Sequence, residues 1–211
     1  MSSFPLTIGT TNVKKGRELV ELLGPHGFEI RTLADYETVH EVVEDGDSFA
    51  ANAQKKAIEQ AQHLNCWVLA DDSGLEVDAL EGRPGIYSAR YAGPEATDEE
   101  NNAHLIEELG QLPLVKRTGR YYCHVAIANP AGQIVAETWG QCRGRIRTKP
   151  SGTNGFGYDP LFEVLEMHRT FGELGPNFKR MISHRARAMR AIVPELLRIK
   201  NQESNLAIQR G

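Results

Sequence analysis

One stretch of the chain, Val68-Leu69-Ala70-Asp71-Asp72-Ser73-Gly74, runs from apolar residues straight into two carboxylates. The apolar run predicts a buried strand that ends at the two aspartates, where Asp-Ser-Gly is also ordinary turn chemistry. Adjacent carboxylates repel each other, so a divalent cation or a set of hydrogen-bond donors at the strand end would make the arrangement tolerable. Side chains alternate along a strand, so Asp71 and Asp72 face opposite sides, and parity alone leaves open which one is functional.

Strands and helices alternate on both sides of this stretch, with a β-rich middle, and this order predicts an α/β fold. The first predicted elements are a strand at Leu6–Ile8 and a helix that has Leu19, Leu22 and Leu23 on one face and stops at Gly24-Pro25. A helix from Ser48 to Leu64 leads to the strand from Val68. A third helix begins at the capping box Thr97-Asp98-Glu99-Glu100, buries Leu105, Ile106 and Leu109, and ends at Gly110. Strands at Tyr121–Ala128 and Ile134–Trp139 and a helix from Ser183 to Lys200 follow. The turn Asn129-Pro130-Ala131-Gly132 indicates a hairpin between the two late strands. Pro194 predicts a kink or a restart in the last helix.

Composition and charge describe an ordinary globular chain and exclude several classes of protein. The chain has 211 residues, of which 40% are hydrophobic and 25% charged, enough for one domain or two closely packed lobes. A formal net charge of −4 argues against general nucleic-acid binding. No window approaches the roughly 18 apolar residues of a membrane span, and Met1-Ser2-Ser3-Phe4-Pro5 lacks the pattern of a signal peptide. We therefore expect a protein that is neither secreted nor inserted in a membrane.

The cysteines point to a reducing compartment. Cys66, Cys123 and Cys142 are an odd number and contain no C-x-x-C pair. Neither a disulfide framework nor a zinc site is expected from them. A cytoplasmic location fits this pattern best.

The loop Thr10-Thr11-Asn12-Val13-Lys14-Lys15 lies between a predicted strand and a predicted helix. Free N–H groups at a helix N-terminus, two hydroxyls, an amide and two ammonium groups make an anion site. The alternative is a simple helix cap at Thr11 or Asn12 followed by solvated lysines.

An acidic run, Glu41-Val42-Val43-Glu44-Asp45-Gly46-Asp47, precedes the second predicted helix. Such runs usually face solvent, but one of these carboxylates could share a cation with the Asp71-Asp72 pair. In the following helix Asn52 and Lys56 lie four residues apart on one face. Lys56 becomes functional if that face looks into a phosphate site.

Two further segments carry candidate binding residues. In Gly152-Thr153-Asn154-Gly155-Phe156-Gly157-Tyr158-Asp159-Pro160 the glycines allow close approach to a ligand, and the Phe156 ring could stack on a nucleobase. The alternative is a long turn whose aromatic residues cover the core. In Lys179-Arg180-Met181-Ile182-Ser183-His184-Arg185 cations gather around a helix N-terminus, where a bound anion would relieve their repulsion by the helix dipole; the alternative is a solvated basic surface.

Together these segments closely resemble the inosine triphosphate pyrophosphatases of the Ham1 type, over residues 7 to about 197. The resemblance is carried by TTNVKK, EDGDSFAANAQKKA, LADDSGLEVDALEGRPGIYSARYAG, GTNGFGYDPLF and KRMISHRARA. It implies an elongated mixed α/β fold with a central twisted sheet and two lobes flanking a substrate cleft. It also implies a homodimer that hydrolyses ITP, dITP and XTP to the monophosphate and pyrophosphate.

The resemblance further implies a role for individual residues. Asp72 is implied as the base that activates water and, with Glu44, as a ligand of Mg²⁺. The substrate-binding residues implied are Thr10, Thr11, Asn12, Val13, Lys14, Lys15, Lys56, Ser73, Phe156, Gly157, Tyr158, Asp159, Lys179, His184 and Arg185. Asp71 is left with a supporting bond or a substrate contact. His184 and Arg185 would meet the 6-oxo group of the base, since a site built for hydrogen bonds can reject a mismatched partner by up to roughly 10⁴-fold.

This chain also departs from the family pattern. Ala51 stands where the family often has Glu, which leaves the full ligand set of the cation open, and Arg180 replaces a frequent Asn. Two other functions stay open at this point. One is a pyrophosphatase of the Maf type that acts on modified pyrimidine or other nucleotides. The other is a nucleotide-binding regulatory protein without catalysis.

Overall fold

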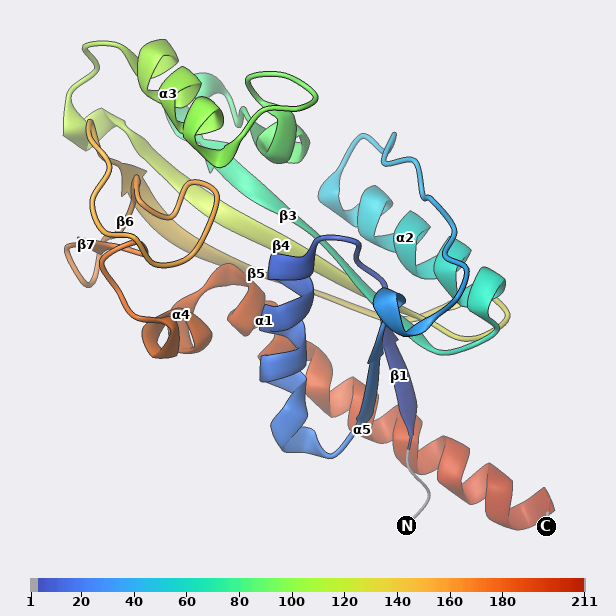
Figure 1. Cartoon of the computed structure of the whole chain (residues 1–211). Coiled ribbons are helices and arrows are strands. Elements are labelled where there is room, and N and C mark those ends of the chain that lie inside the picture. The colour runs from blue at the N-terminus through green and yellow to red at the C-terminus, as the bar shows by residue number, and fades with distance from the viewer. Residues whose placement is uncertain (1–3, 211) are drawn as a thin grey trace. The chain divides into compact units, whose positions relative to one another are not determined.

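A seven-stranded mixed sheet carries the strands of the chain, in the order β2-β1-β3-β4-β5-β6-β7 (Figure 1). This computed structural model describes residues 4–210, with side chains through residue 205; the interpretation of the N-terminus as no signal peptide rests partly on residues 1–3, outside the described part. The strands are β1 Pro5–Ile8, β2 Glu29–Thr32, β3 Val68–Val77, β4 Thr118–Ala128, β5 Ile134–Ile146, β6 Phe162–Val164 and β7 Arg169–Thr170. β1 is parallel to β2 and β3, whereas β6 is antiparallel to β5 and β7. The predicted α/β class is confirmed.

The helices agree with the sequence patterns at most of their ends. They are α1 Val13–Leu23, α2 Phe49–Leu64, α3 Asp98–Leu109, α4 Pro176–Ile182 and α5 His184–Arg210. Ser48 caps α2 by accepting a bond from the Ala51 amide, and the capping box of Thr97 and Glu100 begins α3 as predicted. Among the described residues, no helix is long and apolar enough to span a bilayer.

The chain divides into two compact units, which are described separately. The first unit comprises the described residues of Met1–Asp72, His124–Trp139 and Arg187–Gly211. The second comprises Ser73–Cys123 and Gly140–Ala186. β3, β4 and β5 each contribute residues to both units.

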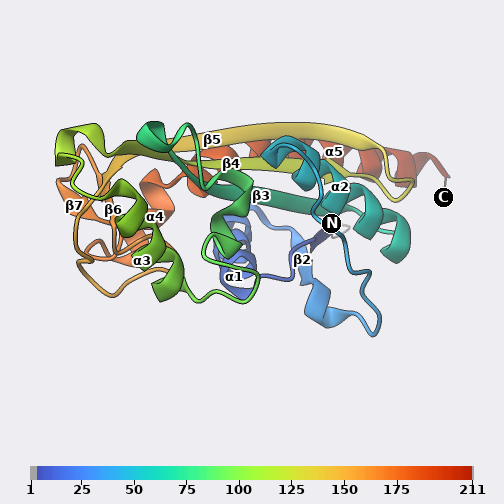
Figure 2. The ribbon, with the colours of Figure 1, turned by 90° about the horizontal axis from the view of Figure 1, so that it is seen from above.

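In the first unit a stripe of alanines on α2 packs against the sheet. Ala53, Ala57 and Ala61 recur every four residues and are fully buried with small residues of β3 and β4, namely Val68, Ala70, Ala126 and Ala128. Small side chains on both partners let the helix approach the strands closely. Figures 1 and 2 both show α2 beside the Val68 end of β3 and the turn between β4 and β5. This packing fixes the α2 face that carries Asn52 and Lys56.

In the second unit a larger core contains aromatic side chains. Its fully or nearly fully buried residues include Leu75 and Val77 of β3, Leu105 and Leu109 of α3, and the rings of Tyr121, Phe162 and Phe171. The Phe162 and Phe171 rings stack at a centroid distance of 5.7 Å. α3 is thereby anchored on its apolar face.

Three sequence predictions need correction. β3 does not end at Asp71 and Asp72 but continues to Val77, because Leu75 and Val77 resume the burial of alternate side chains beyond Ser73-Gly74. β5 extends past Trp139 to Ile146, since Cys142 and Ile146 alternate with exposed or half-buried arginines. α5 runs from His184 through Pro194 to Arg210, so it does not restart at the proline and it ends beyond the predicted Lys200. The sequence patterns also missed β2, β6, β7 and α4, which are short.

Candidate functional site

In the first unit, Asp72 is a buried carboxylate surrounded by hydrogen-bond and charge partners. It is 5% exposed. The Asn52 Nδ2 atom lies 3.3 Å from Oδ2, while the ammonium groups of Lys56 and Lys15 lie 3.2 and 3.8 Å from Oδ1. These partners come from α2 and α1 and converge on one side chain of β3. Asp72 is therefore held in a defined orientation by partners from two helices.

Lys56 is the central cation of this group. It is 7% exposed, and its Nζ atom lies 3.1 Å from Glu44 Oε2 as well as 3.2 Å from Asp72 Oδ1. Burial by itself lowers the pKa of Lys56, but attraction by Asp72, Glu44 and Asp71 outweighs that effect and raises the pKa above its ordinary value. The ammonium group is thus fully charged at neutral pH.

Asn52 connects the acidic loop to the strand. Its Oδ1 accepts a bond of 2.8 Å from the Gly46 amide, while its Nδ2 points to Asp72. A Cβ atom at position 46 would lie 2.6 Å from that Oδ1, so only glycine allows the loop this close to α2. The loop that carries Glu44 is thereby fixed next to Asp72.

Two carboxylates from separate segments therefore converge on one ammonium group. Within the described residues, no group of three or more His, Cys, Asp or Glu side chains is placed to hold a metal ion. Hard cations such as Mg²⁺ need fewer protein ligands when substrate phosphates and water supply the rest. The carboxylate pair of Asp72 and Glu44 fits this type of donor set.

The loop before α1 is a helix cap in this structure. Asn12 Oδ1 accepts a bond of 3.1 Å from the Lys15 amide, and the Asn12 amide donates to Thr10 Oγ1 at 3.2 Å. Thr11, Val13 and Lys14 are exposed. The cap that was the alternative interpretation is present, and Lys15 nevertheless turns toward Asp72. The Asn12 cap thus allows the Lys15 ammonium group to face the Asp72 carboxylate.

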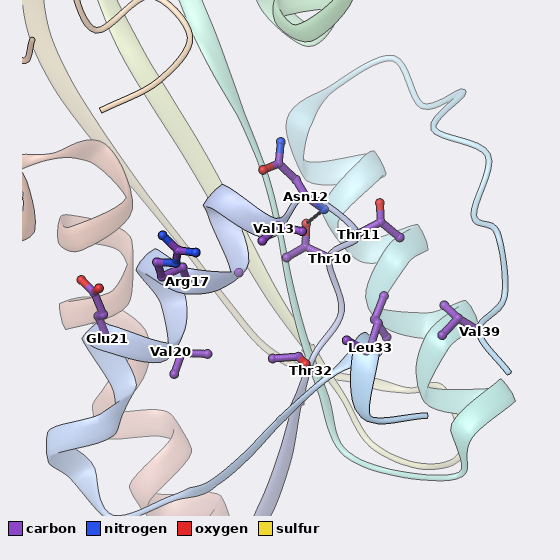
Figure 3. A pocket seen from close by; sticks show the side chains of 12 residues that line it. Thr10, Thr11, Asn12, Val13, Arg17, Val20, Glu21, Thr32, Leu33 and Val39 are labelled. Atoms are coloured by element: carbon purple, nitrogen blue, oxygen red, sulfur yellow. Dashed lines mark hydrogen bonds between the residues drawn. The ribbon is translucent and has the colours of Figure 1, made fainter. Parts of the chain in front are cut away.

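A cavity of about 500 Å³ lies beside this loop, between α1 and the segment around Leu33 (Figure 3). Its lining residues are Thr10, Thr11, Asn12, Val13, Gly16, Arg17, Val20, Glu21, Thr32, Leu33, Ala34 and Val39. The lining contains one cation, Arg17, and one anion, Glu21, and its other residues are uncharged, which is a poor match to a triphosphate. Lys15, Lys56 and Asp72 are not among these residues, so the cavity is separate from the carboxylate group.

In the second unit, the segment Gly155–Asp159 is an ordered loop. Gly155 and Gly157 have φ angles of +78° and +61°. Asp159, which is buried, accepts a bond of 2.9 Å from the Phe156 amide, and Lys179 donates to the same carboxylate at 2.6 Å. The Lys179 ammonium also lies 4.3 Å from the centre of the Phe156 ring. The structure thus brings Phe156, Asp159 and Lys179 together.

Tyr158, in the same loop, is fixed by a separate hydrogen bond. Its hydroxyl donates to the Ser88 carbonyl oxygen at 2.8 Å, and its ring is buried. Burial, with a smaller contribution from the charge of Asp98, raises the pKa of Tyr158 well above its usual range. Tyr158 is therefore a neutral hydrogen-bond donor that shapes the loop.

The start of α5 presents His184 and Arg185. Ser183 caps this helix by accepting from the Ala186 amide at 3.2 Å, as predicted. The His184 ring, 4% exposed, stacks on Tyr121 at a centroid distance of 4.6 Å and an interplanar angle of 11°. Arg185 donates to Ser73 Oγ at 2.8 Å. Ser73 and Arg185, named separately from sequence, are thus direct partners.

The sequence interpretation missed several supporting residues. Asn52 was noticed through its spacing from Lys56 but was given no role, and the spacing was the signal that could have assigned it. Tyr121 looked like an ordinary strand residue, because no local pattern reveals a ring that stacks on a distant histidine. Asp98 and Asn102 of α3 bond to the Gly157 backbone, and no local pattern in the sequence indicates these contacts.

Comparison with known proteins gives a consistent result. The sequence model of the Ham1 family matches residues 6–195. A protein of Rhodopirellula baltica named dITP/XTP pyrophosphatase is 50% identical over 204 residues, which cover 97% of this chain and 98% of that protein. A dITP/XTP pyrophosphatase of Exiguobacterium sp. is 47% identical over 91% of this chain and 96% of its own length.

Solved structures agree with the sequence relatives. The Staphylococcus aureus Ham1 protein superimposes with a TM-score of 0.81 at 34% identity, over 91% of this chain and 97% of that chain. The nucleoside-triphosphatase, or dITP/XTP pyrophosphatase, of Mycobacterium abscessus has a TM-score of 0.73 at 39% identity, over 92% and 100% of the two chains.

Proposed function

Since this chain belongs to the Ham1 family, we propose that it hydrolyses non-standard purine nucleoside triphosphates, namely dITP, XTP and ITP, to the nucleoside monophosphate and pyrophosphate. The observation that carries the proposal is the Asp72 carboxylate, buried and held by Asn52, Lys56 and Lys15. A carboxylate fixed beside cations is what attack by water on a phosphoanhydride requires.

In the proposed reaction Asp72 orients a water molecule and accepts its proton as the oxygen attacks the α-phosphorus. The bond between the α-phosphorus and the bridging oxygen then breaks, and pyrophosphate leaves with the bond electrons. Lys15 and Lys56 stabilise the negative charge that grows on the phosphate oxygens. The amides and hydroxyls of Thr10–Asn12 and the Lys14 ammonium bind the phosphates, with Val13 beginning the helix that presents these groups.

We further propose that the reaction depends on Mg²⁺, which Asp72 and Glu44 would hold. When bound, the ion would neutralise phosphate charge and polarise the scissile bond. The two carboxylates are supported for this role by their convergence on Lys56, which balances their charge. Ala51 in α2 has no side-chain oxygen that could bind the ion. The proposed Mg²⁺ site therefore depends on Glu44 as the second carboxylate beside Asp72.

Base and sugar recognition is assigned to the second unit. Phe156, Gly157, Tyr158 and Asp159 would enclose the base and sugar, while Ser73, Lys179, His184 and Arg185 complete the contacts. The donors His184 and Arg185 favour a 6-oxo purine, because an adenine amino group would present a donor to a donor. We expect this pair to give discrimination against ATP.

Assembly and location complete the proposal. We propose a homodimer in the cytoplasm, acting on free nucleotides and not on nucleic acid. The location is supported by Cys66, Cys123 and Cys142, which form no disulfide within the described residues. The net charge of −4 supports the lack of nucleic-acid binding.

A substrate panel tests the function. Release of pyrophosphate from dITP, XTP, ITP, ATP and GTP is measured with Mg²⁺, and a higher kcat/KM for the first three is expected. Turnover of all five at equal rates, or of none, would contradict the proposal. Preference for modified pyrimidine nucleotides would instead support a Maf-type activity.

A further inference from the structure

The backbone of Gly157 is held at both of its polar groups by one helix. The Gly157 amide donates to Asp98 Oδ2 at 2.9 Å, and the Gly157 carbonyl accepts from Asn102 Nδ2 at 3.0 Å. Asp98 and Asn102 lie four residues apart and so occupy one face of α3. Two bonds from a single helix face fix both the position and the rotation of this peptide segment.

α3 itself is anchored at each end. Its N-terminus carries the capping box, in which Thr97 Oγ1 accepts from the Glu100 amide and Glu100 accepts from the Thr97 amide. Just beyond its C-terminus the buried Arg117 guanidinium donates to the carbonyls of Gly110 and Leu112 at 2.5 and 2.8 Å. With Leu105 and Leu109 in the core, α3 is a rigid support for whatever its polar face holds.

Bonds between Phe156 and Asp159 close the loop, and Gly157 lies between these two residues. Gly157 has a φ of +61°, a conformation that residues with side chains rarely adopt. Lys179 fixes Phe156 and Asp159, and the Tyr158 hydroxyl is bonded to the Ser88 carbonyl, whereas the Gly157 amide and carbonyl are bonded to α3. Asn102 is 8% exposed, so water does not readily replace its amide as the partner of the Gly157 carbonyl.

We propose that Asp98 and Asn102 are positioning residues for base recognition, and that they act by setting the conformation of the Phe156–Asp159 loop. The inference rests on the proposed function, because that function assigns the loop to the base and sugar. Losing either bond frees the loop to sample other conformations, so the substrate must order it on binding. The cost falls on binding of the base and leaves the chemistry at the phosphates unchanged.

Alanine substitutions at these positions test the inference. Asp98→Ala and Asn102→Ala should each raise KM for ITP about three- to tenfold, the fold-change expected from losing one hydrogen bond. The change in kcat should stay within about twofold. The ratio of kcat/KM between ITP and ATP should fall, since a loosely held loop selects less well between bases. Asp98→Asn keeps an acceptor oxygen without the charge and should restore much of the lost affinity.

Glu99→Ala is the matched control. Glu99 is exposed in the same first turn of α3, and its removal changes the net charge by the same amount. Thermal unfolding of every variant shows which ones remain folded at the assay temperature. If Asn102→Ala does not fold, the half-buried Asp98 still provides the test.

Amide exchange gives a second measure that is independent of turnover. Peptides covering residues 155–159 should exchange faster in Asp98→Ala than in Glu99→Ala, without nucleotide. Unchanged KM, base discrimination and exchange in folded variants would overturn the inference, as would equal effects of Glu99→Ala. A wild-type enzyme without base preference would instead contradict the proposed function, so the two failures are distinguishable.

Discussion

Replacing Lys56 by methionine should destabilise the first unit strongly, because the variant leaves Asp72 as a buried carboxylate without its nearest cation. Lys56 and Asp72 are 7% and 5% exposed, and removing one partner of such a buried pair costs about 3–5 kcal/mol. The bond to Glu44 adds about 1 kcal/mol at most, since that side chain is 39% exposed. Lys15, 3.8 Å from Asp72, remains and compensates in part. We therefore expect a loss of about 3 kcal/mol, which for a chain of this size lowers Tm by roughly 6–12 °C.

The assay compares urea and thermal unfolding at pH 7 for the wild type and three variants. Lys55→Met is the matched control: Lys55 is the neighbouring lysine on α2, bonded to the exposed Asp45, and its replacement should leave Tm unchanged within error. The double variant Lys56→Met/Asp72→Asn removes the stranded charge and should recover most of the stability, because two neutral groups of similar size replace the pair. A loss below about 1 kcal/mol for Lys56→Met, or no recovery in the double variant, would refute the electrostatic reasoning.

Further predictions concern the same group. Asp72→Asn should abolish turnover and leave the protein folded, whereas Asp71→Asn should reduce turnover less; retained activity of Asp72→Asn would refute the mechanism. Chelation with EDTA should stop pyrophosphate release, and added Mg²⁺ should restore it; activity that survives exhaustive chelation would contradict the metal requirement. Gly46→Ala should lower kcat/KM about tenfold, since its Cβ would lie 2.6 Å from Asn52 Oδ1 and disturb the support of Asp72; an unchanged rate would count against that support. The pKa of Lys56 in the folded protein is raised above 10.5, so the stability that its charge contributes is present at neutral pH and is lost as the pH rises through the raised pKa. The Tm difference between the wild type and Lys56→Met should therefore shrink above pH 10.5. A constant Tm difference would contradict this pH dependence.

Elements with a local signal could be predicted from the sequence. The capping box of Thr97 and Glu100 gave the start of α3, and Ser48 gave the start of α2. Both depend on hydrogen bonds between residues three apart, which sequence displays directly. The hairpin at residues 129–132 was also correct, since β4 and β5 are neighbours in the sheet.

Features that depend on tertiary partners could not be predicted. β6 and β7 have three and two residues, too short for a periodic pattern, and exist through pairing with β5 and with each other. β5 continues through Gly140-Gln141-Cys142-Arg143-Gly144, where glycines give no strand propensity and burial alone favours extension. Asp72, Glu44 and Lys56 were named as candidate site residues by family resemblance, but their convergence required the fold.

The position of Asp72 inside β3 bears on the proposed mechanism. At a strand end a carboxylate would follow the motion of a loop, whereas a side chain in mid-strand inherits the rigidity of the sheet ladder. That rigidity requires burial, and burial of a carboxylate is unfavourable unless a cation accompanies it. Lys56 meets this need from α2, whose own placement depends on the alanine stripe that packs against β3. The spacing of small residues on α2 therefore supports the proposed active site: enlarging Ala53 or Ala57 would move the Lys56 ammonium group away from Asp72 without changing either charged residue.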